Sequence, residues 1–175
     1  MGSILYEAQK IVSDLLVRVR DLSLDLRPPM LDDLGLLPTL LWFFGRYTDR
    51  TQVKVEFNHN ISSERFTPRV EITAFRIVQE ALTNVARHAG VDQVTVGLRA
   101  DQHVLRVEVQ DQGRGFDPRT QLTSNIGIGL AGMRERARCL KGQFQVESAS
   151  GRGTRLTAVL PLNDVVQGSR TETTE

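Results

Sequence analysis

The sequence predicts an α+β fold: a two-layer sandwich with helices on one face of a sheet, preceded by one long helix. Helical and strand patterns follow one another in the order α, α, β, α, β, β, α, β, β. The last four strand patterns form two pairs, and one helix lies between the pairs. Within each pair a short polar or glycine turn joins the strands, which is typical of antiparallel hairpins. The first helical pattern has the three-four spacing of a helical bundle.

Composition limits the class of protein. The chain has 175 residues, 40% hydrophobic and 25% charged, which suits one soluble domain with an appendage. A net charge of +1 without a dense basic run argues against direct nucleic-acid binding. No signal peptide and no apolar stretch of about 20 residues is present. We expect a cytoplasmic fragment, leaving open whether the parent is membrane-anchored. Residues 1–3 (MGS) are typical of cloning, so we expect the natural protein to begin earlier.

The first helix is expected from residue 4 to about residue 26. Its apolar residues alternate steps of three and four: Leu5, Ala8, Val12, Leu15, Val19, Leu22 and Leu26. This heptad stripe is too apolar to stand alone, so it favours a dimeric helical bundle over packing on its own domain only. Pro28 and Pro29 end the helix, and residues 30–36 are expected to form a connector.

The remaining elements follow from periodicity and from their end signals. Thr67 and Pro68 are typical of the start of a helix, and Gly90 of its end. Residues 111–129 are expected to be largely loop, and Cys139 to be packed inertly in the last helix. We expect helices at 37–49, 68–89 and 130–140, and strands at 53–57, 94–98, 105–109, 144–146 and 156–160.

The central helix has one polar face that can do chemistry. Glu80 and Asn84 lie at i and i+4, so both can reach a magnesium ion or its waters. Arg87 and His88 continue this face with groups that bind phosphate. The plain alternative is a solvated helix face.

Two glycine segments follow this helix. The first, DQGRG (111–115), directly follows a strand, and its Asp111 could accept a hydrogen bond from an adenine amino group. The second, IGIGLAGM (126–133), opens onto a helix, where free N–H groups and the helix dipole attract anions. Neither segment is a P-loop or a dinucleotide fingerprint, and either alone could be an ordinary turn. Together with Glu80 and Asn84 they indicate a magnesium-nucleotide site.

The combination of these motifs resembles the GHKL (Bergerat) ATP-binding domain. The residues that carry the resemblance are EALTN (80–84), DQGRG, GIGL-AGM and GRGT (151–154), in that order and spacing. FRIVQEALTNVARHA (75–89) and GLAGMRERA (129–137) resemble the catalytic domain of sensor histidine kinases that signal to helix-turn-helix regulators. LRPPMLDDLGLLPTL (26–40) resembles the junction with their second dimerisation helix. The resemblance implies a mixed, mostly antiparallel sheet.

The resemblance also implies a division of the chain and roles for the nucleotide site. Residues 4–36 would be dimerisation helix and linker, 37–162 the ATP-binding domain, and 163–175 a disordered tail. Asn84 would ligate Mg²⁺, Glu80 would hold a metal-bound or catalytic water, and Asp111 would bind the adenine amino group.

The glycines and flanking residues would complete that site. Gly113 and Gly115 would shape the adenine pocket, and Thr154 would support it through water. Residues 116–128 would form a lid that closes on the phosphates. Gly127 and Gly129 would permit this closure, with Leu130 and Met133 packed beneath, while Arg87 and His88 would touch phosphate oxygens.

The implied activity is transfer of the γ-phosphoryl group of Mg-ATP to a histidine. None of His59, His88 and His103 has the helical acidic neighbour that such kinases use, so the acceptor is expected upstream of Ile4. The implied partners are ATP or ADP, a response regulator with a helix-turn-helix output, and a second copy of the parent. The alternatives are a GHKL ATPase with Glu80 as base, an anti-sigma serine kinase, and a nucleotide-binding module without catalysis.

Overall fold

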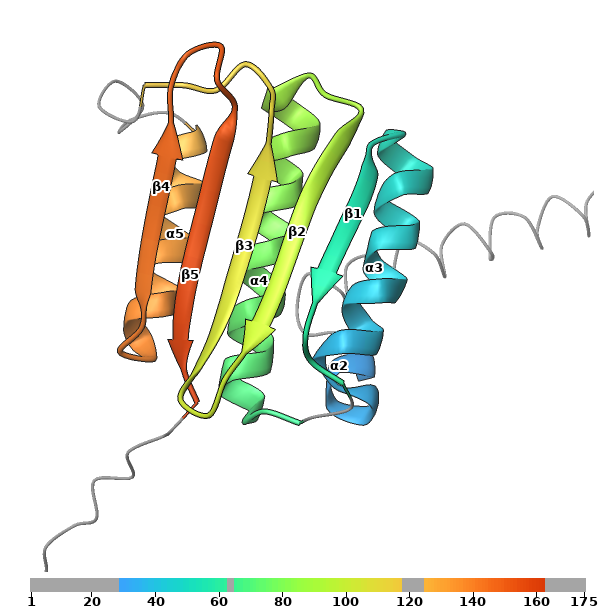
Figure 1. Ribbon diagram of the computed structural model, residues 1–175, viewed down its shortest axis with the longest axis vertical. Helices are drawn as coiled ribbons and strands as arrows, with labels where there is room; N and C mark the ends of the chain where they lie inside the picture. The colour runs from blue at the N-terminus through green and yellow to red at the C-terminus, as the bar shows by residue number, and fades with distance from the viewer. Residues whose placement is uncertain (1–28, 63–64, 118–124, 163–175) are drawn as a thin grey trace, which may run out of the picture.

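The computed structural model describes residues 29–62, 65–117 and 125–162. The expected first helix, the expected tail and most of the expected lid therefore lie outside the described residues. The rest forms a five-stranded sheet with its helices on one face (Figure 1). Among the described residues, no helix has both the length and the apolar character needed to cross a bilayer. The elements are α2 (Pro29–Leu34), α3 (Leu36–Thr51), β1 (Lys54–His59), α4 (Pro68–Asn84), the π-helix η1 (Val85–Ala89), β2 (Gln93–Ala100), β3 (Val104–Asp111), α5 (Asn125–Cys139), β4 (Gln143–Ser148) and β5 (Thr154–Pro161).

The sheet is mixed and mostly antiparallel, as the resemblance implied. Its strand order is β1-β2-β3-β5-β4. β1 runs parallel to β2, and α4 provides the crossover between them. The other three neighbouring pairs are antiparallel. This order puts β3 and β5 side by side, although α5 and β4 separate them in the sequence.

The core lies between the sheet and the helices. Alternate residues of β3 point toward the helices, and Leu105, Val107 and Val109 are buried there. α4 packs against β3 and β5, α5 against β4, and α3 against β1. The side of α4 opposite its polar residues is apolar, and it continues into η1 at Val85. Its members are buried: Ala74, Phe75, Val78, Ala81, Leu82 and Val85. This packing leaves the polar face of the same helix for a site.

Three local expectations were wrong. The expected connector is the short helix α2, which Gly35 separates from α3. α5 starts at Asn125, so Gly127 and Gly129 are helical and do not form a loop. Cys139 is exposed, with Sγ 3.8 Å from Glu135 Oε1. It lies two residues beyond the buried Ala137, which places it away from the buried stripe of the helix.

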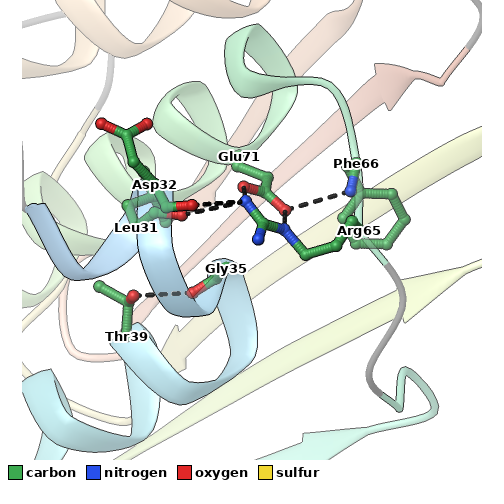
Figure 2. A network of polar contacts seen from close by, with 7 residues as sticks. All are labelled: Leu31, Asp32, Gly35, Thr39, Arg65, Phe66 and Glu71. Carbon is green, nitrogen blue, oxygen red and sulfur yellow. Dashed lines mark hydrogen bonds and ion pairs between the residues drawn. The ribbon is translucent and has the colours of Figure 1, made fainter.

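A buried acidic residue ties α2 to the start of α4 (Figure 2). Glu71 is only 1% exposed. Its carboxylate accepts from Arg65 Nε at 3.1 Å, from Arg65 Nη2 at 3.3 Å and from the backbone N–H of Phe66 at 3.1 Å. Arg65 Nη2 also donates to the carbonyl oxygen of Asp32 at 3.1 Å. One guanidinium therefore links the first turn of α4 to the carboxyl end of α2.

Candidate functional site

The helix-facing side of the sheet changes from apolar to polar where β3 ends and β5 begins. Asp111 occupies the next inward position after Val109, and Thr154 precedes the inward residue Leu156. Asp111 and Thr154 lie directly opposite each other in the antiparallel register. The alternation that buries the core thus delivers a carboxylate and a hydroxyl to one cleft.

Asp111 is the buried acid of this cleft, with only 7% of its surface exposed. The backbone N–H of Gly113 donates to its Oδ1 at 2.8 Å. Burial raises the pKa of Asp111 above its ordinary value of 3.8, while hydrogen bonds from the backbone of Gly113 and Thr154 partly oppose this rise. A carboxylate has about four lone-pair positions, so acceptor capacity remains for a ligand.

The turns around Asp111 interlock with the end of the helix layer. The N–H of Arg114 donates to the carbonyl oxygen of Ala89 at 3.0 Å, and the N–H of Gly153 donates to Gly113 O at 2.9 Å. A Cβ at Gly113 would overlap the backbone of Ala89, and one at Gly115 would overlap Ala149 O. The DQGRG turn therefore needs glycine at both positions so that three backbone segments can approach one another.

The end of α4 and the π-helix η1 form the opposite wall. Asn84 and His88 line the cleft from this side. The backbone N–H of Val85 donates to Ala81 O, four residues back, and to Leu82 O, three residues back. The π-helical turns of η1 follow from this point. Asn84 Nδ2 is buried and has no hydrogen-bond partner within the described part of the chain. A buried amide without a hydrogen-bond partner costs free energy. A ligand in the cleft could supply the partner that this side chain lacks.

Glu80 and Arg87 do not line this cleft but a second, polar hollow. This hollow spans α4, η1 and α5, and its lining residues are Arg76, Gln79, Glu80, Thr83, Arg87 and Arg136. A Cβ at Gly129 would collide with Glu80 Oε1, and it would lie 3.6 Å from Asn84 Nδ2. Gly129 therefore brings the backbone of α5 against both polar residues that were predicted to serve the metal.

The structure brings most of the predicted residues together. Six line the cleft itself: Asn84, His88, Asp111, Gly115, Leu130 and Thr154. Gly113 packs against Ala89, which lines the cleft, and Gly129 packs against Glu80. Met133 is buried in α5. Gly127 lies in the first turn of α5 and does not line the cleft.

Sequence reasoning missed three residues of this region. Phe116 lines the cleft, and its position directly after DQGRG was a signal that could have identified it. Arg136 joins the polar hollow from α5. Ser148 lies behind Thr154 at the end of β4, and no local pattern distinguishes it from other strand serines.

Comparison with known proteins identifies relatives of this arrangement. The family model described as "Histidine kinase-, DNA gyrase B-, and HSP90-like ATPase" matches residues 69–164. The oxygen sensor histidine kinase NreB of Staphylococcus carnosus is 38% identical over 88% of this chain and 44% of its own length. The signal transduction histidine-protein kinase/phosphatase DegS of Brevibacillus brevis is 37% identical over 89% of this chain and 40% of its own length. The chain thus spans less than half the length of these curated relatives.

Solved structures show the same fold. The histidine kinase domain of the blue-light activated histidine kinase EL346 from Erythrobacter litoralis has a TM-score of 0.51 and 23% identity, covering 70% of this chain and 59% of its own. The Acinetobacter baumannii histidine kinase AdeS has a TM-score of 0.55 and 15% identity, covering 93% of this chain and 84% of its own. With the family model matching more than half of the sequence, the chain belongs to the histidine kinase-, DNA gyrase B- and HSP90-like ATPase family.

Proposed function

We propose that this chain is the ATP-binding catalytic part of a sensor histidine kinase, which transfers the γ-phosphoryl group of Mg-ATP to a histidine of its parent protein. The observation that carries the proposal is the cleft in which Asp111 and Thr154 face Asn84 and His88. The relatives named as histidine kinases support the choice of reaction. The same relatives suggest a response regulator as one partner. We propose in addition that the parent pairs with a second copy of itself.

Asp111 would recognise the base. While it is ionised, its carboxylate is a hydrogen-bond acceptor and not a donor. An exocyclic amino group supplies the matching donor. Leu130 and Phe116 line the same cleft and offer apolar surface for the flat faces of a purine.

Asn84 and Glu80 would serve the phosphate end. Their side chains offer an amide and a carboxylate one turn apart, and oxygen ligands of this kind suit Mg²⁺ together with phosphate oxygens. The buried Asn84 amide without a partner fits such a role, because a 180° flip about its last torsion places oxygen where Nδ2 lies. When bound, the ion neutralises phosphate charge. Asn84 would position it, and Glu80 would hold a water at its side.

The chain's own contribution to catalysis would be mostly positioning. Arg87 and His88 follow Asn84 on η1 and can donate to phosphate oxygens. Such donors stabilise the charge that develops during phosphoryl transfer. The described helices and strands would hold the nucleotide while a histidine from another part of the parent approaches the γ-phosphorus.

The histidines of this chain are poor candidates for the acceptor. His59 ends β1, stacks on Phe57 and has Nδ1 2.8 Å from Ile61 O. His103 lies next to the turn between β2 and β3, where its N–H donates to Asp101. His88 lines the nucleotide cleft. We therefore place the acceptor outside the described domain.

Calorimetric titration with ATP, with and without Mg²⁺, tests the proposal. We expect saturable one-site binding by the wild-type chain, its loss in Asp111→Asn, and loss of the magnesium dependence in Asn84→Ala. Asp101→Asn is the matched control, because Asp101 lies in the exposed turn before β3 and should leave binding unchanged. Full ATP affinity in Asp111→Asn would contradict the assignment of the base. Steady phosphate release by the chain alone would favour an ATPase.

A further inference from the structure

Ser148, the last residue of β4, is the hub of a small hydrogen-bond network behind the cleft. Its Oγ donates to the carbonyl oxygen of Gly153 at 2.9 Å. It accepts from the backbone N–H of Phe116 at 2.9 Å. Its third contact is with Thr154 Oγ1 at 3.1 Å. Ser148 itself does not line the cleft, whereas Phe116 and Thr154 do.

Counting hydrogens decides the direction of the third contact. A serine hydroxyl has one hydrogen and two acceptor lone pairs. The carbonyl oxygen of Gly153 can only accept, so it takes the single hydrogen of Ser148. Ser148 can therefore only accept from Thr154, and the hydroxyl hydrogen of Thr154 points toward Ser148. With the N–H of Phe116 as its second donor, Ser148 has every hydrogen-bonding position filled.

The consequence for the cleft is that Thr154 can only accept there. A threonine hydroxyl also has one hydrogen, and Ser148 uses it. Thr154 lies opposite Asp111 in the strand register, and an ionised Asp111 is likewise an acceptor only. The polar pair at this end of the cleft therefore asks for hydrogen-bond donors, whether they come from the ligand directly or from a water between them.

We propose that Ser148 is a positioning residue that sets base selectivity: by fixing the Thr154 hydroxyl as an acceptor, it favours 6-amino purines over 6-oxo purines. This inference rests on the proposed function, because it assumes a purine nucleotide in the cleft. A 6-amino group brings two hydrogens to the pair of acceptors. A 6-oxo group brings lone pairs, and a buried clash of acceptors is costly.

Ser148 also has a structural role, which the test must separate from selectivity. Through Phe116 and Gly153 it holds together the segment after β3 and the turn before β5. Loss of these two hydrogen bonds would lower the affinity for every nucleotide by a similar factor. Loss of the fixed hydroxyl would change the ratio of affinities between two bases, which an anchor alone does not move.

The experiment is to measure the dissociation constants of ATP and inosine triphosphate for the wild type, Ser148→Ala, Ser148→Thr and Ser150→Ala. Inosine triphosphate differs from ATP only in its 6-oxo group and the hydrogen on the neighbouring ring nitrogen. In Ser148→Ala the Thr154 hydroxyl is free to donate, so we expect the preference for ATP to fall about five- to tenfold. Ser148→Thr keeps the hydroxyl and should restore the preference. Ser150→Ala, in the exposed turn, should match the wild type.

The outcomes separate this inference from the proposed function. Equal weakening of both nucleotides in Ser148→Ala would reduce Ser148 to an anchor and overturn the inference. If Ser148→Ala does not fold, Thr154→Val answers the question, because it removes the hydroxyl while leaving the other two Ser148 contacts. An unchanged preference in Thr154→Val would also overturn the inference. Failure of the wild type to bind ATP at all would overturn the proposed function itself.

Discussion

Gly129 of α5 lies so close to Glu80 of α4 that a methyl group on its Cα would overlap Glu80 Oε1. The two helices therefore approach each other closely at the carboxylate that we assign to the phosphate end of the site. Glycine is a poor helix former, and its presence inside α5 costs about 1 kcal/mol relative to alanine. Glycine occupies this position because any larger residue would overlap Glu80.

Gly129→Ala should separate binding from stability. The added methyl group meets the flexible end of Glu80 and not backbone, so the fold can adjust by moving that carboxylate. We expect the Mg-ATP affinity to fall about tenfold, with a thermal midpoint equal to or above that of the wild type. Gly45→Ala is the control: it lies within α3, and its new methyl group meets nothing within 4 Å. Wild-type Mg-ATP affinity in Gly129→Ala would disprove the link between Gly129 and Glu80.

Asp111→Asn should stabilise the chain at neutral pH while it removes ATP binding. Because burial raises the pKa of Asp111, its contribution to stability is fully present below the unfolded value of 3.8 and is lost as the pH rises through the raised folded pKa. At pH 7 the ionised carboxylate therefore opposes folding. Urea unfolding at a series of pH values should give the variant a larger free energy of unfolding than the wild type at pH 7. This difference should disappear below pH 3.8.

Asp101→Asn serves as the control of opposite sign for that pH series. Backbone hydrogen bonds from His103 and then Val104 hold the pKa of Asp101 below 3.8. Its contribution is present above pH 3.8 and is lost as the pH falls through the lowered value. Asp101→Asn should therefore be less stable than the wild type at neutral pH. If both variants shift stability in the same direction at pH 7, the burial explanation for Asp111 fails.

Arg65→Ala should destabilise the chain by about 2 to 3 kcal/mol, because it leaves the buried Glu71 carboxylate without its cation. The Arg65 side chain is 48% exposed and that of Glu71 only 2%, so the cost falls on Glu71. Arg155→Ala is the matched control. Its ion pair with Glu108 is exposed on both sides and should contribute less than about 1 kcal/mol. Equal midpoints of urea unfolding for the two variants would show that burial of Glu71 is unimportant.

Gly153→Ala should destabilise the chain clearly more than Gly151→Ala. Both residues have positive φ, at +71° for Gly153 and +74° for Gly151, and this conformation costs alanine about 1 to 2 kcal/mol. At Gly151 the new methyl group meets open space, whereas at Gly153 it overlaps Asp111 O. Thermal unfolding of the two variants measures the difference, and similar midpoints would mean that the Asp111 strand end can move aside freely.

The elements that local patterns specify were predicted well. The alternation of Leu105, Val107 and Val109 was enough to find β3 and to place Asp111 at its end. The apolar face of α4 was enough to find the helix and its polar side. Such patterns are written in neighbouring residues, so one sequence is sufficient to read them.

The errors arose where distant contacts decide. Gly127 and Gly129 looked like a loop, yet both lie in α5, where Gly129 packs against Glu80 of α4. Arg65 and Glu71 carry no pattern that connects them to Asp32, because α3 and β1 intervene. Ser148 gained its importance only when β4 and β5 paired and placed it beside Thr154.

α4 carries Glu71 in its first turn and Asn84 as its last residue, about 20 Å apart at about 1.5 Å per residue. Glu71 is linked by hydrogen bonds through Arg65 to the carboxyl end of α2, and Asn84 lines the cleft. One continuous helix thus has one end beside α2 and the other at the cleft to which we assign the nucleotide. A small tilt of α2 would therefore displace Asn84, because α4 is one unbroken α-helix between the two contacts.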